Sequence, residues 1–425
     1  MSKGSSATEQ LIKWVDTNLV PPMVKIAEYP PIVAVRNATI AAMPIIIVGS
    51  FLLLIAMFGQ PWIGVPEPLI PALTPYSGKI LDIFSLTMGI MALYIAFGAG
   101  YHYAAINKLN ALNGGLLSIM SFLIIAAPPV AGALPTGFLG AAGIFPAFIA
   151  GLVSVEVYKW LEKSGLVIRM PKGVPPAIAE AFVALTPVAV LATLFGVIRI
   201  IMGINIPALI LDLFRPIVVA GDNVFAWGVD TFLRAALWSV GVHGCATVGA
   251  IMDPLAIIWG AENSAAALAG VLPRNLPHIW VPAFDRITTW WGTHVPLNVM
   301  CLFSKSKRIR TVGWVALPAM VFCIIEPLHF GLPVVMNPIF WIPFVFGFTF
   351  TSVLTYVAAM TGVIARFFVF LPWATPGPII GFVSSGGDLM TGLWPFVNAA
   401  IGAVIFWPFF KAFEKQVLGE EAKAK

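Results

Sequence analysis

Charged side chains are scarce in this sequence: Asp, Glu, Lys and Arg together make up 10% of its 425 residues. Soluble globular domains are about 25% charged, so this composition excludes an ordinary soluble protein. Hydrophobic residues instead make up 59%, and the mean hydropathy is +0.94. The uncharged stretches are long enough to cross a bilayer as helices, which takes about 20 residues each. The sequence therefore predicts an all-α polytopic membrane protein.

Cysteines and cofactor motifs are equally scarce. The three cysteines, Cys245, Cys301 and Cys323, fit neither a disulfide framework nor the spacing of a zinc site. The sequence contains no phosphate-binding P-loop and no cluster of metal ligands, so we predict no cofactor and no metal, and a primary pump is disfavoured. No cleavable signal peptide is recognisable, so we expect the first span to be retained.

Basic residues give the chain a net charge of +5, but they gather in short segments between the apolar stretches. Such segments orient membrane spans through the positive-inside rule, so we predict no nucleic-acid partner. They lie at 3–36, 159–172, 305–310 and 411–415. We predict that all four face the cytoplasm, which places both termini on the cytoplasmic side of the cell membrane.

Five spans are predicted in the first half of the chain, after an amphipathic lead-in at 1–35. They fall at 37–66, at 83–107, twice within 109–155, and from 174 to about 202. An amphipathic connector follows at 204–229, and beyond it charges and Pro/Gly interruptions recur inside apolar sequence. Broken segments of this kind are typical of the binding half of a transporter. We therefore predict two domains, 1–203 and 204–425.

Glu326 is the residue that most clearly marks a functional site, because it is the only charged residue between Arg310 and Arg366. A carboxylate at membrane depth usually faces the bundle interior or a wet cavity and marks a substrate or ion path. Pro327, directly after it, predicts a broken helix rather than a plain span. The alternative is that Glu326 is a loop residue between two spans.

Three further places carry polar or aromatic groups that a ligand can use. His243 lies in a glycine-rich turn, although a histidine at a span end is often an interface or core residue. Trp373 lies among prolines and can cover the apolar face of a ring, or belong to an aromatic belt. The segment 288–294 is too polar for a lipid-facing helix and predicts a re-entrant or cavity-lining loop. Together these groups suit a sugar, so the residues alone predict a transporter.

Several motifs occur in a fixed order along the chain. They are RMPKGVPP (169–176), VHG (242–244), FSKSK (303–307), EP (326–327), FGLPVVMNP (330–338), PWATP (372–376) and WPFFK (407–411). This ordered set resembles the membrane-embedded IIC component of a sugar phosphotransferase system, in the lactose/cellobiose/diacetylchitobiose branch. The resemblance covers most of residues 36–415.

The resemblance implies about ten transmembrane helices with two re-entrant hairpins, and a homodimer joined through the amino-terminal half. A bound sugar, such as the disaccharide cellobiose, lactose or diacetylchitobiose, would be phosphorylated by the phosphocysteine of a separate IIB protein. His243 and Glu326 would bind the accepting hydroxyl, with Glu326 as the base, and Trp373 would lie against a sugar ring. The predicted sugar site is completed by Trp290, Thr293, His294 and Asn337.

Two positions at this site depart from the family pattern. Ile325 stands where the family usually has Asn, and TWWGTH at 289–294 replaces the usual Gly-Gly-Ser-Gly-Ala-Thr. We predict that 290–294 sets sugar selectivity; the alternative is that Trp290 and Trp291 only pack the hairpin. Two other functional classes stay open at this stage. One is a secondary transporter or uniporter with Glu326 as a proton site and no covalent chemistry, and the other is a membrane enzyme acting on a lipid-linked sugar.

Overall fold

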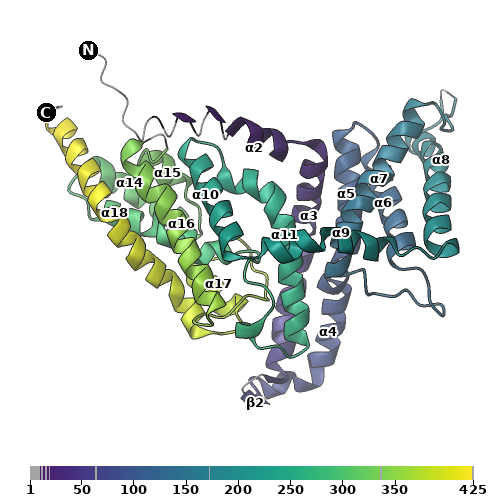
Figure 1. Ribbon diagram of the computed structural model, residues 1–425, viewed down its shortest axis with the longest axis horizontal. Coiled ribbons are helices and arrows are strands. Elements are labelled where there is room, and N and C mark those ends of the chain that lie inside the picture. Colours follow the sequence, from purple (N-terminus) through teal and green to yellow (C-terminus); the bar gives the residue numbers. More distant parts are fainter. Residues whose placement is uncertain are drawn as a thin grey trace. The chain divides into compact units, whose positions relative to one another are not determined.

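The computed structural model describes residues 10, 13–14, 17–18, 20–62, 65–171, 173–335 and 337–423 (Figure 1). Regular structure in this part of the chain is helical apart from one short antiparallel strand pair, β1 (Pro61–Trp62) and β2 (Val65–Pro68). Among the described residues, seven helices are long and apolar enough to cross a membrane, and α6 is a shorter apolar helix. The predicted all-α class is confirmed, while the number of about ten spans stays a prediction.

One compact unit comprises Glu28–Ala220 together with Asp253–Glu262. Its α-helices are α3 (Pro30–Phe58), α4 (Ser77–Leu86), α5 (Met91–Ile106), α6 (Ala111–Ala126), α7 (Ile144–Lys163), α8 (Pro176–Gly196) and α9 (Ile206–Gly221). Shorter turns of helix lie at Pro71–Tyr76, Met88–Ile90, Ala141–Gly143 and Val197–Ile201. The five predicted spans correspond to α3, α5, α6, α7 and α8. The helix of the first predicted span, α3, begins at Pro30 rather than at residue 37, because proline is pre-organised for the first helical turn.

Small residues allow α5, α6 and α7 to pack closely in this unit (Figure 1). A Cβ added at Gly100 would lie 2.3 Å from the carbonyl oxygen of Gly114, and one at Gly151 would lie 2.7 Å from the Cβ of Ala99. Close backbone approach through small side chains is a common way for helices to associate in membranes. Any larger side chain at Gly100 would therefore push α5 and α6 apart.

The other compact unit comprises Gly221–Met252 and Asn263–Lys425, together with Met1–Ala27. Its α-helices are α2 (Val20–Ala27), α10 (Val224–Ser239), α12 (Thr289–Gly292), α13 (His294–Leu302), α14 (Lys307–Val321), α15 (Glu326–Gly331), α16 (Pro338–Met360), α17 (Gly377–Ser384) and α18 (Leu389–Lys423), and α11 (Gly244–Leu268) contributes its two ends. Two 3-10 turns lie at Pro273–Asn275 and Phe284–Ile287. Four of the helices that follow α10 in this unit have nine residues or fewer, so the predicted helix interruptions are confirmed. Most of the lead-in before α2 lies outside the described residues.

Aromatic side chains form the core that holds these short helices. One buried cluster contains Trp238 of α10, Trp290 of α12, Phe344 of α16 and Phe406 of α18, together with Leu328 of α15. The long helices α16 and α18 lie side by side in this unit (Figure 1). Large rigid rings bury much apolar area at low conformational cost. The core thus fixes segments that are too short to be stable helices alone.

Asp222, between α9 and α10, is a buried carboxylate that connects distant parts of the same unit. It accepts hydrogen bonds from the backbone N–H groups of Ile279 (2.9 Å) and Trp280 (3.0 Å), and from the Tyr356 hydroxyl (2.9 Å). The His278 ring lies 3.1 Å away. Burial raises the pKa of Asp222, but the hydrogen bonds from His278 and these partners lower it by more, so it lies below its usual value.

We predict that Asp222→Ala lowers the unfolding free energy by about 3 kcal/mol at pH 7, because several buried donors lose their acceptor. The exposed Asp212→Ala is the control and should change it little. Because the folded-state pKa is depressed, the contribution is complete above the usual value of 3.8 and is lost as the pH falls below it. Thermal unfolding of the three proteins in detergent at several pH values measures this, and equal midpoints at pH 7 would contradict the anchoring role.

Candidate functional site

Glu326 is the first residue of the short helix α15. Helix α14 ends at Val321, and the chain turns through Cys323, whose φ of +59° is in the left-handed region. Ile325 and Leu328 are buried at 2% and 0% exposure. These two apolar side chains anchor α15 in the aromatic core, while the Glu326 side chain is 44% exposed. The local sequence therefore holds a carboxylate in a fixed place without burying it.

His243 lies opposite Glu326, in the turn between α10 and α11. Its Nδ1 accepts a hydrogen bond from the backbone N–H of Ala246 (3.0 Å), which caps α11. The neutral imidazole therefore carries its proton on Nε2, and Nε2 lies 4.0 Å from Oε1 of Glu326. This separation is too long for a direct hydrogen bond. A hydroxyl between the two groups can accept from Nε2–H and donate to the carboxylate.

Trp373 belongs to the same region and is 52% exposed. The Arg286 guanidinium carbon lies 5.7 Å from the centre of the Trp373 ring and 5.2 Å from that of Trp290. Cation–π attraction at these distances orders the exposed indole. Nε of Arg286 lies 3.5 Å from Oδ1 of Asp285, so the guanidinium is partly neutralised. Trp290 itself is buried at 3% exposure and supports Arg286 from the core side.

The other predicted sugar-binding residues direct their polar atoms to protein partners in this structure. Thr293 and His294 are buried, with the Thr293 hydroxyl 2.6 Å from the carbonyl oxygen of Thr289 and 3.0 Å from Nδ1 of His294. Oδ1 of Asn337 caps α16 by accepting from the N–H of Ile339 (2.9 Å). Direct contact of these residues with a sugar stays a prediction.

Aromatic rings connect most of the predicted residues into one cluster. The Trp238 ring lies 4.4 Å from that of His243 and 5.2 Å from that of His329, measured between ring centres. His294 in turn lies 5.3 Å from His329 and 5.6 Å from Trp290. The cluster thus extends from the His243–Glu326 pair to Trp373 through Arg286.

Three members of this cluster were not predicted as site residues: Trp238, Arg286 and His329. One sequence signal was available for His329, which follows Glu326 by three residues and so lies on the same face of a helix. The positions of Trp238 and Arg286 depend on contacts between segments far apart in the sequence, which no local pattern indicates.

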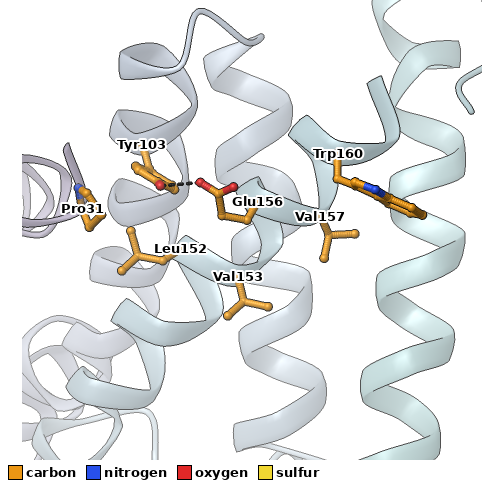
Figure 2. A pocket seen from close by; sticks show the side chains of 7 residues that line it. All are labelled: Pro31, Tyr103, Leu152, Val153, Glu156, Val157 and Trp160. Atoms are coloured by element: carbon orange, nitrogen blue, oxygen red, sulfur yellow. Dashed lines mark hydrogen bonds between the residues drawn. The ribbon is translucent and has the colours of Figure 1, made fainter. Parts of the chain in front are cut away.

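A separate cavity of about 540 Å³ lies in the other unit, between α3, α5 and α7 (Figure 2). Leu152, Val153 and Val157 form its apolar wall, and the Tyr103 hydroxyl donates to Glu156 at 2.5 Å (Figure 2). Sugar sites need several polar groups for the hydroxyls. This cavity offers one carboxylate that is already hydrogen-bonded, so we do not place the sugar site there.

Comparison with known proteins gives consistent matches over nearly the whole chain. Residues 36–347 match the family model described as "Phosphotransferase system, EIIC". The cellobiose-specific EIIC component of Geobacillus stearothermophilus is 31% identical, over 97% of this chain and 96% of that protein. The lactose-specific EIICB component of Streptococcus mutans is also 31% identical, over 92% of this chain and 70% of that protein. Among solved structures, ChbC, the IIC component from the N,N'-diacetylchitobiose-specific phosphotransferase system, matches with a TM-score of 0.87 and 28% identity, over 96% of this chain and 99% of that one.

We predict that Trp373→Ala weakens sugar binding by a few-fold to about tenfold, the effect of losing an aromatic contact of about 0.5–1.5 kcal/mol. Thermal stability should change little because the indole is half exposed. Trp290→Ala, in the core, should instead lower the unfolding free energy by about 3–5 kcal/mol.

Trp290 can set sugar selectivity or only pack the core, and the binding of a panel of mono- and disaccharides separates these two roles. The exposed Trp160→Ala is the control. A changed rank order of sugars supports selectivity, whereas a uniform loss with lower stability supports packing alone.

Proposed function

This chain belongs to the EIIC family of the phosphotransferase system, and on that premise we propose that it is a disaccharide permease whose bound sugar is phosphorylated by a IIB protein. The observation that carries the proposal is the 4.0 Å gap between Nε2 of His243 and Oε1 of Glu326. A donor and an acceptor at this spacing suit one hydroxyl group, and both side chains are about half exposed.

The chemistry follows from that arrangement. A sugar hydroxyl accepts a hydrogen bond from Nε2–H of His243 and donates a hydrogen bond to the Glu326 carboxylate. Its oxygen then attacks the phosphorus of the IIB phosphocysteine: the new O–P bond forms, the S–P bond breaks, and the hydroxyl proton passes to the Glu326 carboxylate. Phosphoryl transfer depends mainly on positioning the nucleophile, which is what two groups on rigid supports provide.

The substrate class is proposed from the relatives and from the aromatic groups beside the pair. The relatives' names include cellobiose, lactose and N,N'-diacetylchitobiose. In this chain Trp373 offers an indole face to a sugar ring, and the Arg286 guanidinium beside it offers N–H donors. We therefore propose a disaccharide, with Trp290, Thr293, His294 and Asn337 shaping its site.

The IIB partner is proposed to be a separate protein. The name EIICB of the lactose-specific relative joins the IIC and IIB designations, and this chain covers 70% of that protein. We propose that the basic loop 304–310 faces the cytoplasm and borders the IIB docking surface. Glu414 of α18 accepts from the Ser304 hydroxyl (2.6 Å) and the Lys305 N–H (2.8 Å), which fixes this loop. A homodimer joined through residues 1–203, with sugar binding in 204–425 and both termini cytoplasmic, completes the proposal.

We predict that Glu326→Gln lowers the rate of sugar phosphorylation about a hundredfold or more, while the sugar Kd changes less than tenfold. The amide is nearly isosteric but accepts a proton poorly, so binding and chemistry should separate. Phosphorylation by purified phosphotransferase partners and binding of radiolabelled sugar measure the two effects.

Glu67→Gln makes the same chemical change at an exposed position and should leave both quantities unaltered. A normal phosphorylation rate in Glu326→Gln would contradict the assignment of Glu326 as the base. A different result would favour a secondary transporter with Glu326 as the proton site: the wild-type protein would transport sugar without phosphorylating it, and Glu326→Gln would abolish that transport.

The cytoplasmic orientation of the basic loop predicts that a cysteine at Lys307 is labelled by a membrane-impermeant maleimide only after the cells are permeabilised. Lys307 is exposed, whereas Ser306 is buried as the cap of α14, so Lys307 is the better probe position. The substitution is made in a variant lacking Cys245, Cys301 and Cys323. Lys79 is exposed and lies between the first two predicted spans, 37–66 and 83–107, so one crossing separates it from the cytoplasmic amino terminus, and Lys79→Cys should react in intact cells. Labelling of Lys307→Cys in intact cells would reverse the orientation.

A further inference from the structure

His294 and His329 form a buried pair beside the candidate site, with 1% and 0% exposure. Nε2 of His294 lies 3.2 Å from Nδ1 of His329, and Nε2 of His329 lies 3.2 Å from the carbonyl oxygen of Trp238. At the other end, Nδ1 of His294 lies 3.0 Å from the Thr293 hydroxyl. Four residues from α10, α12–α13 and α15 are thereby joined in one hydrogen-bonded chain.

The positions of the protons in this chain follow from elementary donor and acceptor rules. A carbonyl oxygen only accepts, so Nε2 of His329 must carry a proton that it donates to Trp238. A neutral His329 then has a bare Nδ1, which requires Nε2–H of His294 as its donor. Nδ1 of His294 is bare in turn and faces the Thr293 hydroxyl (3.0 Å), whose single proton is shared between this nitrogen and the carbonyl oxygen of Thr289 (2.6 Å). Every ring nitrogen is satisfied with both imidazoles neutral.

The opposite arrangement places a charge in the core. If the Thr293 hydroxyl donates to the carbonyl oxygen of Thr289 and accepts from Nδ1–H of His294, then Nε2 of His294 becomes an acceptor. His329 must then donate from both nitrogens and is an imidazolium. Burial of a charge without a counter-charge is costly, so the neutral arrangement is favoured.

The hydrogen bond from His329 to Trp238 connects the two supports of the candidate site. His329 lies three residues after Glu326 on α15, and Trp238 lies five residues before His243 at the end of α10. The indole of Trp238 also packs 4.4 Å from the His243 ring. A displacement of α15 relative to the end of α10 would therefore change the gap between Glu326 and His243.

We propose that His294 and His329 are positioning residues that set the separation of His243 and Glu326: Nε2–H of His294 donates to Nδ1 of His329, and Nε2–H of His329 donates to the carbonyl oxygen of Trp238. This inference rests on the proposed role of that pair, but the arrangement of the protons is independent of any sugar. It also gives the unusual His294 in the 289–294 segment a role without direct sugar contact.

The proton arrangement is tested by ¹⁵N NMR of the full-length protein labelled at histidine, in nanodiscs without sugar. The chain has five histidines, so each ring can be assigned by substitution. Wild-type His294 and His329 are expected as neutral Nε2–H tautomers. An Nδ1–H tautomer or an imidazolium at His329 would overturn the proposal.

The positioning role is tested by phosphorylation kinetics of His294 variants. The amide nitrogen of Gln can take the place of Nε2, so His294→Gln should retain the hydrogen bond to Nδ1 of His329 and lower kcat less than the two variants that lose this bond. His294→Leu removes the donor, and His294→Asn is too short to reach His329. Both should leave Nδ1 of His329 without its donor, which changes the ¹⁵N resonance of that nitrogen, and both should lower kcat about tenfold to a hundredfold, with KM changed much less.

Thermal unfolding of each variant identifies those that remain folded. If His294→Leu does not fold, the kinetic test uses His294→Asn. A folded variant whose ¹⁵N spectrum shows Nδ1 of His329 without a hydrogen-bond donor, but whose kcat is normal, would overturn the positioning role. Failure of the base assignment at Glu326 would leave the tautomers of the wild-type protein unaffected, so the two failures are distinguishable.

Discussion

The cost of placing ionisable groups in an apolar protein is the constraint that organises this structure. Most buried charges in the unit that contains α10 to α18 are satisfied by close partners. Nε of Arg234 lies 2.7 Å from Oδ2 of Asp230, and Nζ of Lys411 lies 2.7 Å from Oε2 of Glu414. Asp222 accepts hydrogen bonds from two backbone N–H groups and from the Tyr356 hydroxyl. Glu326 and His243 differ, because both are about half exposed and stand 4.0 Å apart. The candidate site is thus the place where polar groups are held ready for an external partner.

The rigidity of that site comes from the aromatic core. Helix α15 has six residues and would not persist alone, yet Leu328 and Ile325 place it against Phe344 and Trp238. Helices at membrane depth that are interrupted by proline or glycine need neighbours to satisfy their free backbone groups. Here the neighbours are large rings and a buried histidine pair, so one arrangement of packing determines both the fold and the spacing of the site.

Hydropathy, proline and glycine placement predicted much of the fold. The spans of the first half and the broken helix at Glu326-Pro327 follow from local sequence, whereas the residues at which α14 ends and α15 begins do not. The pairing of Glu326 with His243 was predicted from the resemblance and from the scarcity of charge. The contact of Arg286 with Trp290 and Trp373 was not predictable, because residue 373 reaches residue 286 only through tertiary packing. The polar residues of segment 289–294 predicted the lining of a cavity. In the structure their hydroxyl and imidazole groups have protein partners, which tertiary packing also determines.

Helix α18 has a length that bears on how the protein can move. Its 35 residues extend about 50 Å along the axis, well beyond the roughly 30 Å of a bilayer's hydrocarbon core. Near its carboxyl end, Glu414 and Glu421 hold the loop 304–310 through Ser304 and Ser306. The opposite end of the helix packs against α17. A tilt of α18 would therefore displace that loop and α17 together, so a protein pressing on the loop would exert torque on the helices next to Trp373.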